Sequence, residues 1–255
     1  MPKKYLHYDN PLLSAVKDGN YDSAESLLKL GARISTLDES NYSALHTAVK
    51  YNYIELAKLL LDYGADVNLQ SIFNGTPLHI AVDNKNYDIA KLLLDYNASV
   101  SIPDRLGYTS LHSAVRIMRP DFIKLLLQYA NENIIDIQNK YGNTPLHLAA
   151  LLDDMNSIET LLLYKPNIKI HNNDNETPID IAYDDNIRQF LMNRKNVFYD
   201  ENDNTNKNDN NEFTNANNEF ANANNKKEFY YVLYKYYPEL GTYKFAGKAN
   251  KIWIN

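Results

Sequence analysis

The 255-residue sequence predicts an all-α repeat solenoid of stacked helix-turn-helix units with projecting β-turns. The first observation is a tetrapeptide that recurs as SALH (43–46), TPLH (76–79), TSLH (109–112) and TPLH (144–147), with its histidines 33, 33 and 35 residues apart. The second is a leucine-rich run after each copy, at 59–61, 92–94, 125–127 and 161–163. A fixed period in this range is typical of units that bury their apolar faces only against one another.

The first helix of each unit is predicted to begin at the tetrapeptide. Thr76 and Thr144 precede a proline at the first helical position, and Ser43 occupies the same place, so each hydroxyl can cap the helix. This helix is expected to be short, roughly two turns.

The second helix contains the leucine run and is expected, in the third unit, from near Asn86 to near Tyr96. Gly64 and Asn97 follow their runs, at a position that suits the left-handed backbone closing a helix. Polar connectors such as DVNLQS (66–71) then predict tight, extended turns that project from the stack.

The segments NGTPLHIAVDNKNYDIAKLLLDYNASV (74–100) and YGNTPLHLAALLDDMNSIETLLLY (141–164) resemble ankyrin repeats, whose signature is T-P-L-H-x-A at a period of 33. Counting by this period also identifies degenerate outer repeats around Leu13 and Asp180. The resemblance therefore implies six repeats between about residues 8 and 192, at about 8–37, 40–69, 73–102, 106–137, 141–170 and 174–192.

The repeats depart from the family pattern between their helices and around residues 130–156. Many ankyrin repeats place glycine between the helices, but here only Gly19 does so; Asn52 can mimic it, and the other repeats have Lys85, Met118 and Asp153 in or near that place. Two extra residues lie within 131–142, and we expect one more around 152–156. Neutral loop drift and a locally altered binding edge are both open interpretations.

The C-terminal part has a different composition. We expect 193–227 to be a disordered, low-complexity linker, because residues 201–225 contain twelve asparagines and no Leu, Ile or Val. Residues 228–255 form an aromatic, basic segment whose β-branched and aromatic runs predict two or three short strands. This segment could dock on the last repeat, bind a partner or touch a membrane surface.

Composition narrows the function classes. The chain has no cysteine, which excludes disulfides and thiolate metal sites. Its net charge of −6 argues against general nucleic-acid binding. No apolar run is long enough for an integral membrane segment, and the N-terminal segment has no signal-peptide h-region. We expect a soluble monomer compatible with an intracellular location, in the cytoplasm or exported into a host cell without a conventional signal peptide.

No residue pattern predicts catalysis or a bound cofactor. The four tetrapeptide histidines lie on successive repeats, and the resemblance implies that each ties its repeat to a neighbouring turn. The pairs Asp153-Asp154 and Asp184-Asp185 precede helices, where the helix dipole favours acids. Tyrosines recurring at the ends of the second helices are interpreted as packing residues: Tyr63, Tyr96, Tyr129 and Tyr164.

The resemblance implies that a partner meets the turn tips and the exposed side of the first helices, which line a concave face. We therefore expect a non-enzymatic scaffold that binds a protein partner. The alternative is a bipartite adaptor, such as a pathogen effector in a host cell, whose C-terminal segment recruits a second partner or a membrane. The candidate partner-binding residues are Tyr42, Tyr51, Phe73, Arg105, Tyr108, Arg116, Ile117, Tyr141 and Leu151. Ile72 and Lys140 also lie at tip positions.

Overall fold

The computed structural model describes residues 10–38, 41–72, 75–130 and 134–198, together with two short strands near the C-terminus. The chain divides into two units, residues 1–200 and residues 201–255, and each is described by itself. The first unit contains all the helices found in the described residues, and these helices follow one another as six antiparallel pairs.

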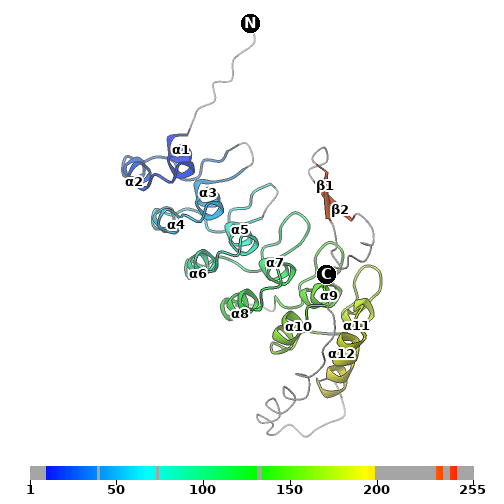
Figure 1. The fold of residues 1–255 in the computed structure, drawn as a ribbon. Coiled ribbons are helices and arrows are strands. Elements are labelled where there is room, and N and C mark those ends of the chain that lie inside the picture. Colours follow the sequence, from blue (N-terminus) through cyan, green and yellow to red (C-terminus); the bar gives the residue numbers. More distant parts are fainter. Residues whose placement is uncertain are drawn as a thin grey trace, which may run out of the picture. The chain divides into compact units, whose positions relative to one another are not determined.

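The paired helices stack in two rows. The odd-numbered helices each contact the next odd-numbered helix, and α2 to α10 contact one another in the same way (Figure 1). The connections between pairs project from the odd-numbered row as extended loops (Figure 1). The pairs are α1 (Pro11–Lys17) with α2 (Tyr21–Lys29), α3 (Ala44–Lys50) with α4 (Ile54–Asp62), α5 (Pro77–Asp83) with α6 (Tyr87–Asp95), α7 (Ser110–Arg116) with α8 (Pro120–Tyr129), α9 (Pro145–Leu151) with α10 (Met155–Leu162), and α11 (Pro178–Ile181) with α12 (Asp185–Phe198). This arrangement confirms the predicted all-α repeat solenoid.

The core runs through the stack because every repeat contributes the same apolar positions. The helices α4, α6, α8 and α10 each contribute one fully buried leucine at the equivalent position: Leu60, Leu93, Leu126 and Leu161. Small buried residues such as Ala48 and Ala81 let the odd-numbered helices pack closely. The core is therefore continuous along the stack and depends on every neighbouring pair.

The residue expected to be inserted around 152–156 is absent. Three residues separate α9 from α10, as they separate α5 from α6. The equivalent of Leu93 is Leu161, so the fifth leucine run starts one residue late only because Thr160 replaces its first member. Leu163 is consequently 63% exposed, outside the core. The prediction was wrong because a substitution within the run imitated an insertion.

The two extra residues expected within 131–142 change the end of the fourth repeat. Gly64 and Asn97 close their helices with φ of 85° and 63°, as predicted, whereas Ala130 after α8 is extended, with φ −72° and ψ 121°. Ile134 and Ile135 are buried again, at 1% and 4% exposed. At Ala130 the longer connection therefore lacks the left-handed backbone found at Gly64 and Asn97. It returns to the core at Ile134 and Ile135. Residues 131–133 lie outside the described part.

The position between the helices of a pair is left-handed in every repeat from the first to the fifth. Its φ is 68° at Gly19, 60° at Asn52, 60° at Lys85, 52° at Met118 and 51° at Asp153. This confirms the place predicted from the glycine pattern. A side chain in this conformation costs about 1–2 kcal/mol unless it is Gly, Asn or Asp, so Lys85 and Met118 carry local strain.

The two ends of the stack are irregular in different ways. At the start, the Asn10 side chain caps α1 by accepting from the N–H groups of Leu12 and Leu13. At the end, α11 has only 4 residues, and α12 continues to Phe198, beyond the boundary that we expected at 192. None of the described helices is long and apolar enough to cross a membrane.

The second unit contains a pair of antiparallel strands, β1 (Tyr234–Tyr237) and β2 (Thr242–Phe245). Tyr234 pairs with Phe245, and Tyr237 pairs with Thr242. Both strands fall within the aromatic segment for which two or three strands were predicted. The predicted linker from residue 199 onward and the rest of the segment lie outside the described residues, so the docking and recruiting roles stay predictions.

Candidate binding surface

The recurring histidine joins each repeat to the tip of the next one. Within its own repeat, its Nδ1 lies 3.1–3.2 Å from the backbone N of the residue that caps the odd-numbered helix. A backbone N–H can only donate, so Nδ1 accepts this bond and the proton of the neutral ring resides on Nε2. Nε2 then donates to a carbonyl of the following tip: His46 to Gly75, His79 to Tyr108, His112 to Asn143 and His147 to Glu176, at 3.0–3.4 Å. The predicted structural role of these histidines is confirmed.

Burial keeps these imidazoles neutral. Each of the four is 0% or 1% exposed. Loss of solvation lowers the pKa of His46 and His112 to about 4, and it lowers the pKa of His79 and His147 as well. A protonated ring would place a hydrogen on Nδ1, facing the backbone N–H from which it now accepts. The tie between repeats therefore requires the uncharged ring.

An Asp or Asn side chain folds most of the tips internally. The Oδ1 of Asp104 accepts from the N–H groups of Leu106 and Tyr108, at 2.8 and 2.9 Å. Asn139 and Asn172 form the same pair of bonds in the next two tips. In the third repeat Ser71 takes this place, and its hydroxyl instead donates to the carbonyl of Gly75 at 3.2 Å. Asp and Asn suit these short polar turns, because their side-chain oxygen accepts from backbone N–H groups that have no backbone acceptor.

The last three tips are also joined to one another. The N–H of Lys140 donates to the carbonyl of Leu106 at 3.1 Å, and the N–H of Asn173 donates to the carbonyl of Tyr141 at 3.0 Å. Gly142 permits this approach, because a Cβ added there would lie 2.5 Å from the backbone N of Asn173. Its φ of 76° also favours glycine. The tips of the fourth to sixth repeats thus form one hydrogen-bonded row.

Two tyrosines extend from the tips along the odd-numbered helices. Tyr42 and Tyr108 are half-buried and meet the rings of His46 and His112 edge to face, with centroids 5.4 and 5.7 Å apart. The Nζ of Lys50, at the end of α3, lies 5.5 Å from the centroid of the Tyr42 ring. These tyrosines therefore cover the surface between the tips and the ends of the helices.

The other candidate residues line the same odd-numbered row. Tyr51 is 45% exposed and stacks on Tyr53, with ring centroids 5.8 Å apart. Arg116 makes an ion pair of 2.8 Å with Asp83 of the preceding repeat. Burial acts to lower the pKa of this guanidinium, but the charge and hydrogen bond of Asp83, together with Tyr108 and Asp104, outweigh burial and raise the pKa. The remaining candidates are Arg105 and Tyr141, which are exposed at their tips, and Ile117 and Leu151, which are half-buried at the helix ends. Phe73 lies outside the described residues.

Sequence reasoning did not select two exposed apolar residues. Leu106 is 36% exposed at the tip of the fourth repeat, and Met118 is 49% exposed beside Ile117. Leu106 occupies the tip position that Tyr141 holds in the next repeat, 35 residues later. Aligning the tips by their Asx residues would have found it.

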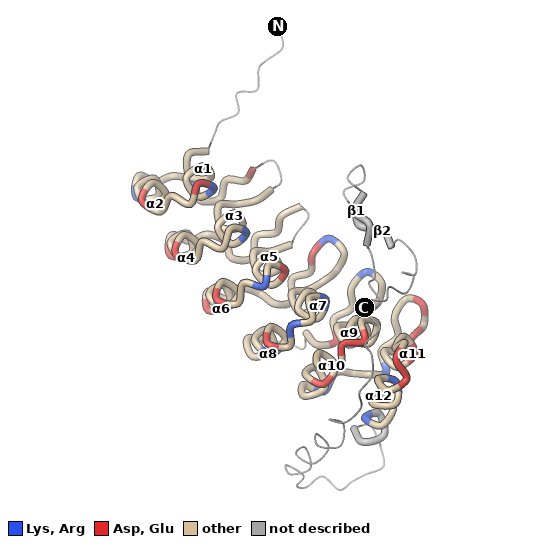
Figure 2. The backbone as a smooth tube through the Cα atoms, viewed as in Figure 1, with Lys and Arg blue, Asp and Glu red and all other residues tan. Residues whose placement is uncertain are grey.

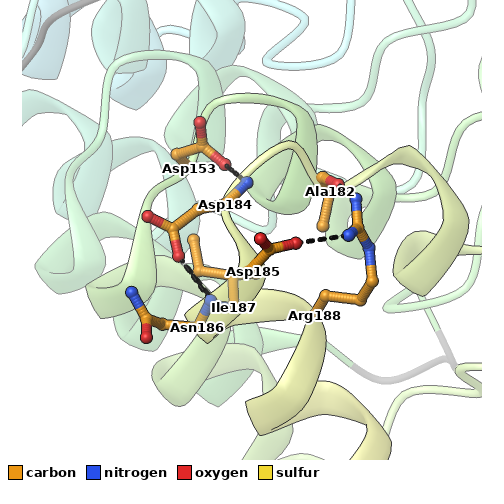
Figure 3. A network of polar contacts seen from close by, with 7 residues as sticks. All are labelled: Asp153, Ala182, Asp184, Asp185, Asn186, Ile187 and Arg188. Atoms are coloured by element: carbon orange, nitrogen blue, oxygen red, sulfur yellow. Dashed lines mark hydrogen bonds and ion pairs between the residues drawn. The ribbon is translucent and has the colours of Figure 1, made fainter.

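The acidic pairs near the end of the stack cap helices and connect repeats (Figure 3). The N–H of Asp184 donates to Asp153 Oδ1 at 3.2 Å, and Asp184 Oδ1 accepts from the N–H of Asn186 at 2.7 Å. Asp185 pairs with Arg188 at 2.5 Å. Burial raises the pKa of Asp153. Asp154, the second residue of the pair Asp153-Asp154, caps α10. The carboxylates thus act as the sequence predicted for acids ahead of a helix.

The tyrosines at the ends of the even-numbered helices do more than pack. Tyr96 donates through its hydroxyl to Asp62, and Tyr129 donates to Asp95 at 2.5 Å. Each bond joins one repeat to the preceding repeat. Tyr63 and Tyr164 are 42% and 37% exposed. Tyr96 and Tyr129 also pack against the core, as predicted, and each adds a hydrogen bond to the preceding repeat.

Comparison with known proteins agrees with this geometry. A family model described as ankyrin repeats (many copies) matches residues 12–61, 45–94 and 81–127, and a second model of the same description matches residues 126–182. No curated protein matches the chain. Ankyrin repeats generally mediate protein–protein interaction, and ankyrin-repeat proteins are typically non-enzymatic interaction modules. With matches that together span residues 12–182 and repeats tied by the recurring histidine, the chain belongs to the ankyrin-repeat family.

Proposed function

We propose that this protein is a non-enzymatic scaffold that binds a protein partner through its inner face, meaning the tips and the ends of the odd-numbered helices. The observation that carries the proposal is the hydrogen-bonded row of tips, on which exposed large side chains recur. A surface that is ordered before binding loses little conformational entropy when a partner docks.

The side chains on the inner face favour protein recognition. Tyrosine and arginine are enriched among the residues that contribute most to protein–protein binding, because each combines a large contact area with a polar group. Tyr108, Arg116 and Tyr141 come from two neighbouring repeats, so one partner can contact all three. Tyr51 and Tyr42 offer a second aromatic area, beside Lys50, in the second repeat.

The polar groups that first suggest chemistry are already engaged in the fold. The tetrapeptide histidines use both ring nitrogens in hydrogen bonds, and Asp153 and Asp184 accept bonds from backbone N–H groups. The histidines therefore have no free ring nitrogen to act as a base, and the two carboxylates hold backbone N–H groups in place. This supports a binding role without an accompanying reaction.

Affinity capture of partners with the full-length chain tests the proposal. Alanine is introduced at inner positions and, as a matched set, at exposed lysines of the even-numbered helices, Lys58 and Lys91. The inner positions are Tyr108, Arg116, Ile117 and Tyr141, together with Phe73, which is placed there by the sequence prediction alone. We expect at least one inner substitution to weaken capture by roughly 2 kcal/mol or more, as anchors in interfaces do, and the lysine set to have little effect. If the lysine substitutions weaken capture while all inner ones leave it unchanged, the inner face is not the binding surface.

A further inference from the structure

The tips of the fourth and fifth repeats repeat one combination of side chains. In each tip an exposed cation is followed by an exposed large apolar residue, Arg105 with Leu106 and Lys140 with Tyr141. We call these four residues the tip strip. We infer that the tip strip binds an acidic protein segment whose apolar side chains pack on Leu106 and Tyr141. This inference rests on the proposed function and adds the chemistry of the partner to it.

The backbone holds the tip strip at a fixed spacing. The N–H of Lys140 donates to the carbonyl of Leu106, which joins the two tips directly. Gly107 allows this contact, since a Cβ added there would lie 2.7 Å from the backbone N of Lys140. Neighbouring repeats stack about 8–10 Å apart, as packed helices do. The two apolar side chains are therefore presented at one repeat's separation.

The tip strip carries two positive charges, those of Arg105 and Lys140, that no described acid neutralises. Among the described residues, neither Arg105 nor Lys140 forms an ion pair, whereas Arg116 is paired with Asp83. The nearest acid in sequence, Asp104, directs its Oδ1 to the N–H groups of Leu106 and Tyr108 within the tip. Figure 2 shows a blue segment at each of the tips before α7 and α9, a red segment beside the blue one before α7, and red segments at the tip before α11. The cations thus stand out on a chain of net charge −6.

These features select the partner's chemistry. Carboxylates on the partner complement the two cations, which speeds encounter and excludes basic competitors. Exposed Leu106 and Tyr141 gain from burial against apolar side chains, at about 25 cal/mol for each Å² removed from water. A phosphate backbone would satisfy the cations but would bring no aliphatic side chain to Leu106. An acidic protein segment satisfies both kinds of residue.

The spacing also sets the pattern within that segment. A separation of about 10 Å corresponds to roughly three residues of a polyproline II helix, which brings every third side chain to the same face. A β-strand does not fit, because its residues i and i+3 point to opposite faces. The fitting sequence therefore has an apolar residue at every third position and acidic residues between them. This pattern defines a synthetic probe that does not depend on knowing the natural partner.

The experiment measures peptide binding to the full-length chain by fluorescence anisotropy. The probe is a labelled peptide with leucine at every third position and glutamate elsewhere, and matched peptides carry glutamine or lysine in place of glutamate. We expect the glutamate peptide to bind about tenfold more tightly than the glutamine peptide, with an affinity that falls as salt is added, because exposed charges are screened. The lysine peptide should bind most weakly.

Substitutions place the binding on the tip strip. Arg105→Glu with Lys140→Glu should weaken the glutamate peptide by about tenfold or more and should abolish its preference over the glutamine peptide. The control pair, Lys58→Glu with Lys91→Glu, makes the same charge change on exposed residues of α4 and α6 and should retain binding. Leu106→Ala with Tyr141→Ala should weaken both peptides. Circular dichroism confirms that each variant keeps its helices.

Several outcomes overturn the inference. If the glutamate and glutamine peptides bind with equal affinity, charge does not contribute to binding. If the tip pair and the control pair of substitutions lose equal affinity, the peptide does not bind at the tip strip. Tighter binding of single-stranded DNA than of the glutamate peptide, lost in the tip pair, identifies a nucleic-acid surface instead. If no peptide binds, an acidic segment is not the ligand. The proposed function still stands in that case if alanine at the inner face abolishes capture of the partner.

Discussion

Lowering the pH is expected to destabilise the stack by protonating its buried histidines. The folded state lowers the pKa of His46 and His112 from about 6.5 to about 4, because burial disfavours the charged ring. The unfolded chain therefore binds more protons between these two values. A depressed folded pKa means that the stability is fully present above about pH 6.5 and is lost as the pH falls towards about 4.

The size of the effect follows from the two pKa values. At about pH 5 each of these histidines is almost fully protonated in the unfolded chain and about one-tenth protonated in the folded protein. Between about pH 7 and pH 5 each then removes about 2 kcal/mol from the free energy of unfolding, or about 4 kcal/mol together. The lowered pKa values of His79 and His147 act in the same direction. Since domains are typically stable by 5–15 kcal/mol, this is a large share.

Urea unfolding followed by circular dichroism at a series of pH values measures this loss. The variant His112→Gln isolates one site, since glutamine does not titrate in this range. It should be less stable than the parent near neutral pH, but its stability should fall less steeply, by roughly 1 kcal/mol per pH unit near pH 5. A free energy of unfolding that stays constant from about pH 7 to pH 5, or an unchanged slope in the variant, would refute the reasoning.

Three further predictions concern the backbone and the chain boundary. Gly142→Ala should destabilise the protein by at least about 1 kcal/mol more than Gly64→Ala, because both have positive φ but only Gly142 has a backbone N, that of Asn173, within reach of the new Cβ; equal losses in urea unfolding would show that the close approach does not matter. Met118→Gly should raise the free energy of unfolding by up to about 1 kcal/mol, since relief of the left-handed strain outweighs the added chain entropy; a lower urea midpoint would contradict this. A fragment ending at Phe198 should keep its helical circular dichroism and unfold cooperatively, and a loss of either would mean that later residues are needed for the repeats.

The sequence was sufficient for the repeat architecture because the same local signals recur in every unit. Ser43 and Thr144 accept from the N–H groups of the histidines three residues later, so the predicted capping follows from residue type alone. Gly64 and Asn97 likewise adopt the expected left-handed backbone. Where a signal was misread, as at Thr160, a single polar substitution inside a helix had the same appearance in sequence as an inserted residue.

The binding surface was only partly accessible from sequence. The positions of Tyr108, Arg116 and Tyr141 could be assigned from the period, but their contacts could not. Whether a cation is free depends on the neighbouring repeat: Arg116 has Asp83 opposite it, and no described acid pairs with Arg105. The hydrogen bonds between tips are also non-local, and nothing in a single repeat indicates them.

The histidine ties all point in one direction along the chain, and this determines where mutations will be felt. His79 belongs to the third repeat, but the carbonyl that it holds is that of Tyr108, in the tip of the fourth. A substitution that disturbs a binding tip can therefore lie in the preceding repeat, at a buried histidine. In the sixth repeat Asp180 stands in place of the histidine, and its carboxylate accepts from the N–H of Thr177. Asp180→His is accordingly the first change needed to extend the array by another repeat.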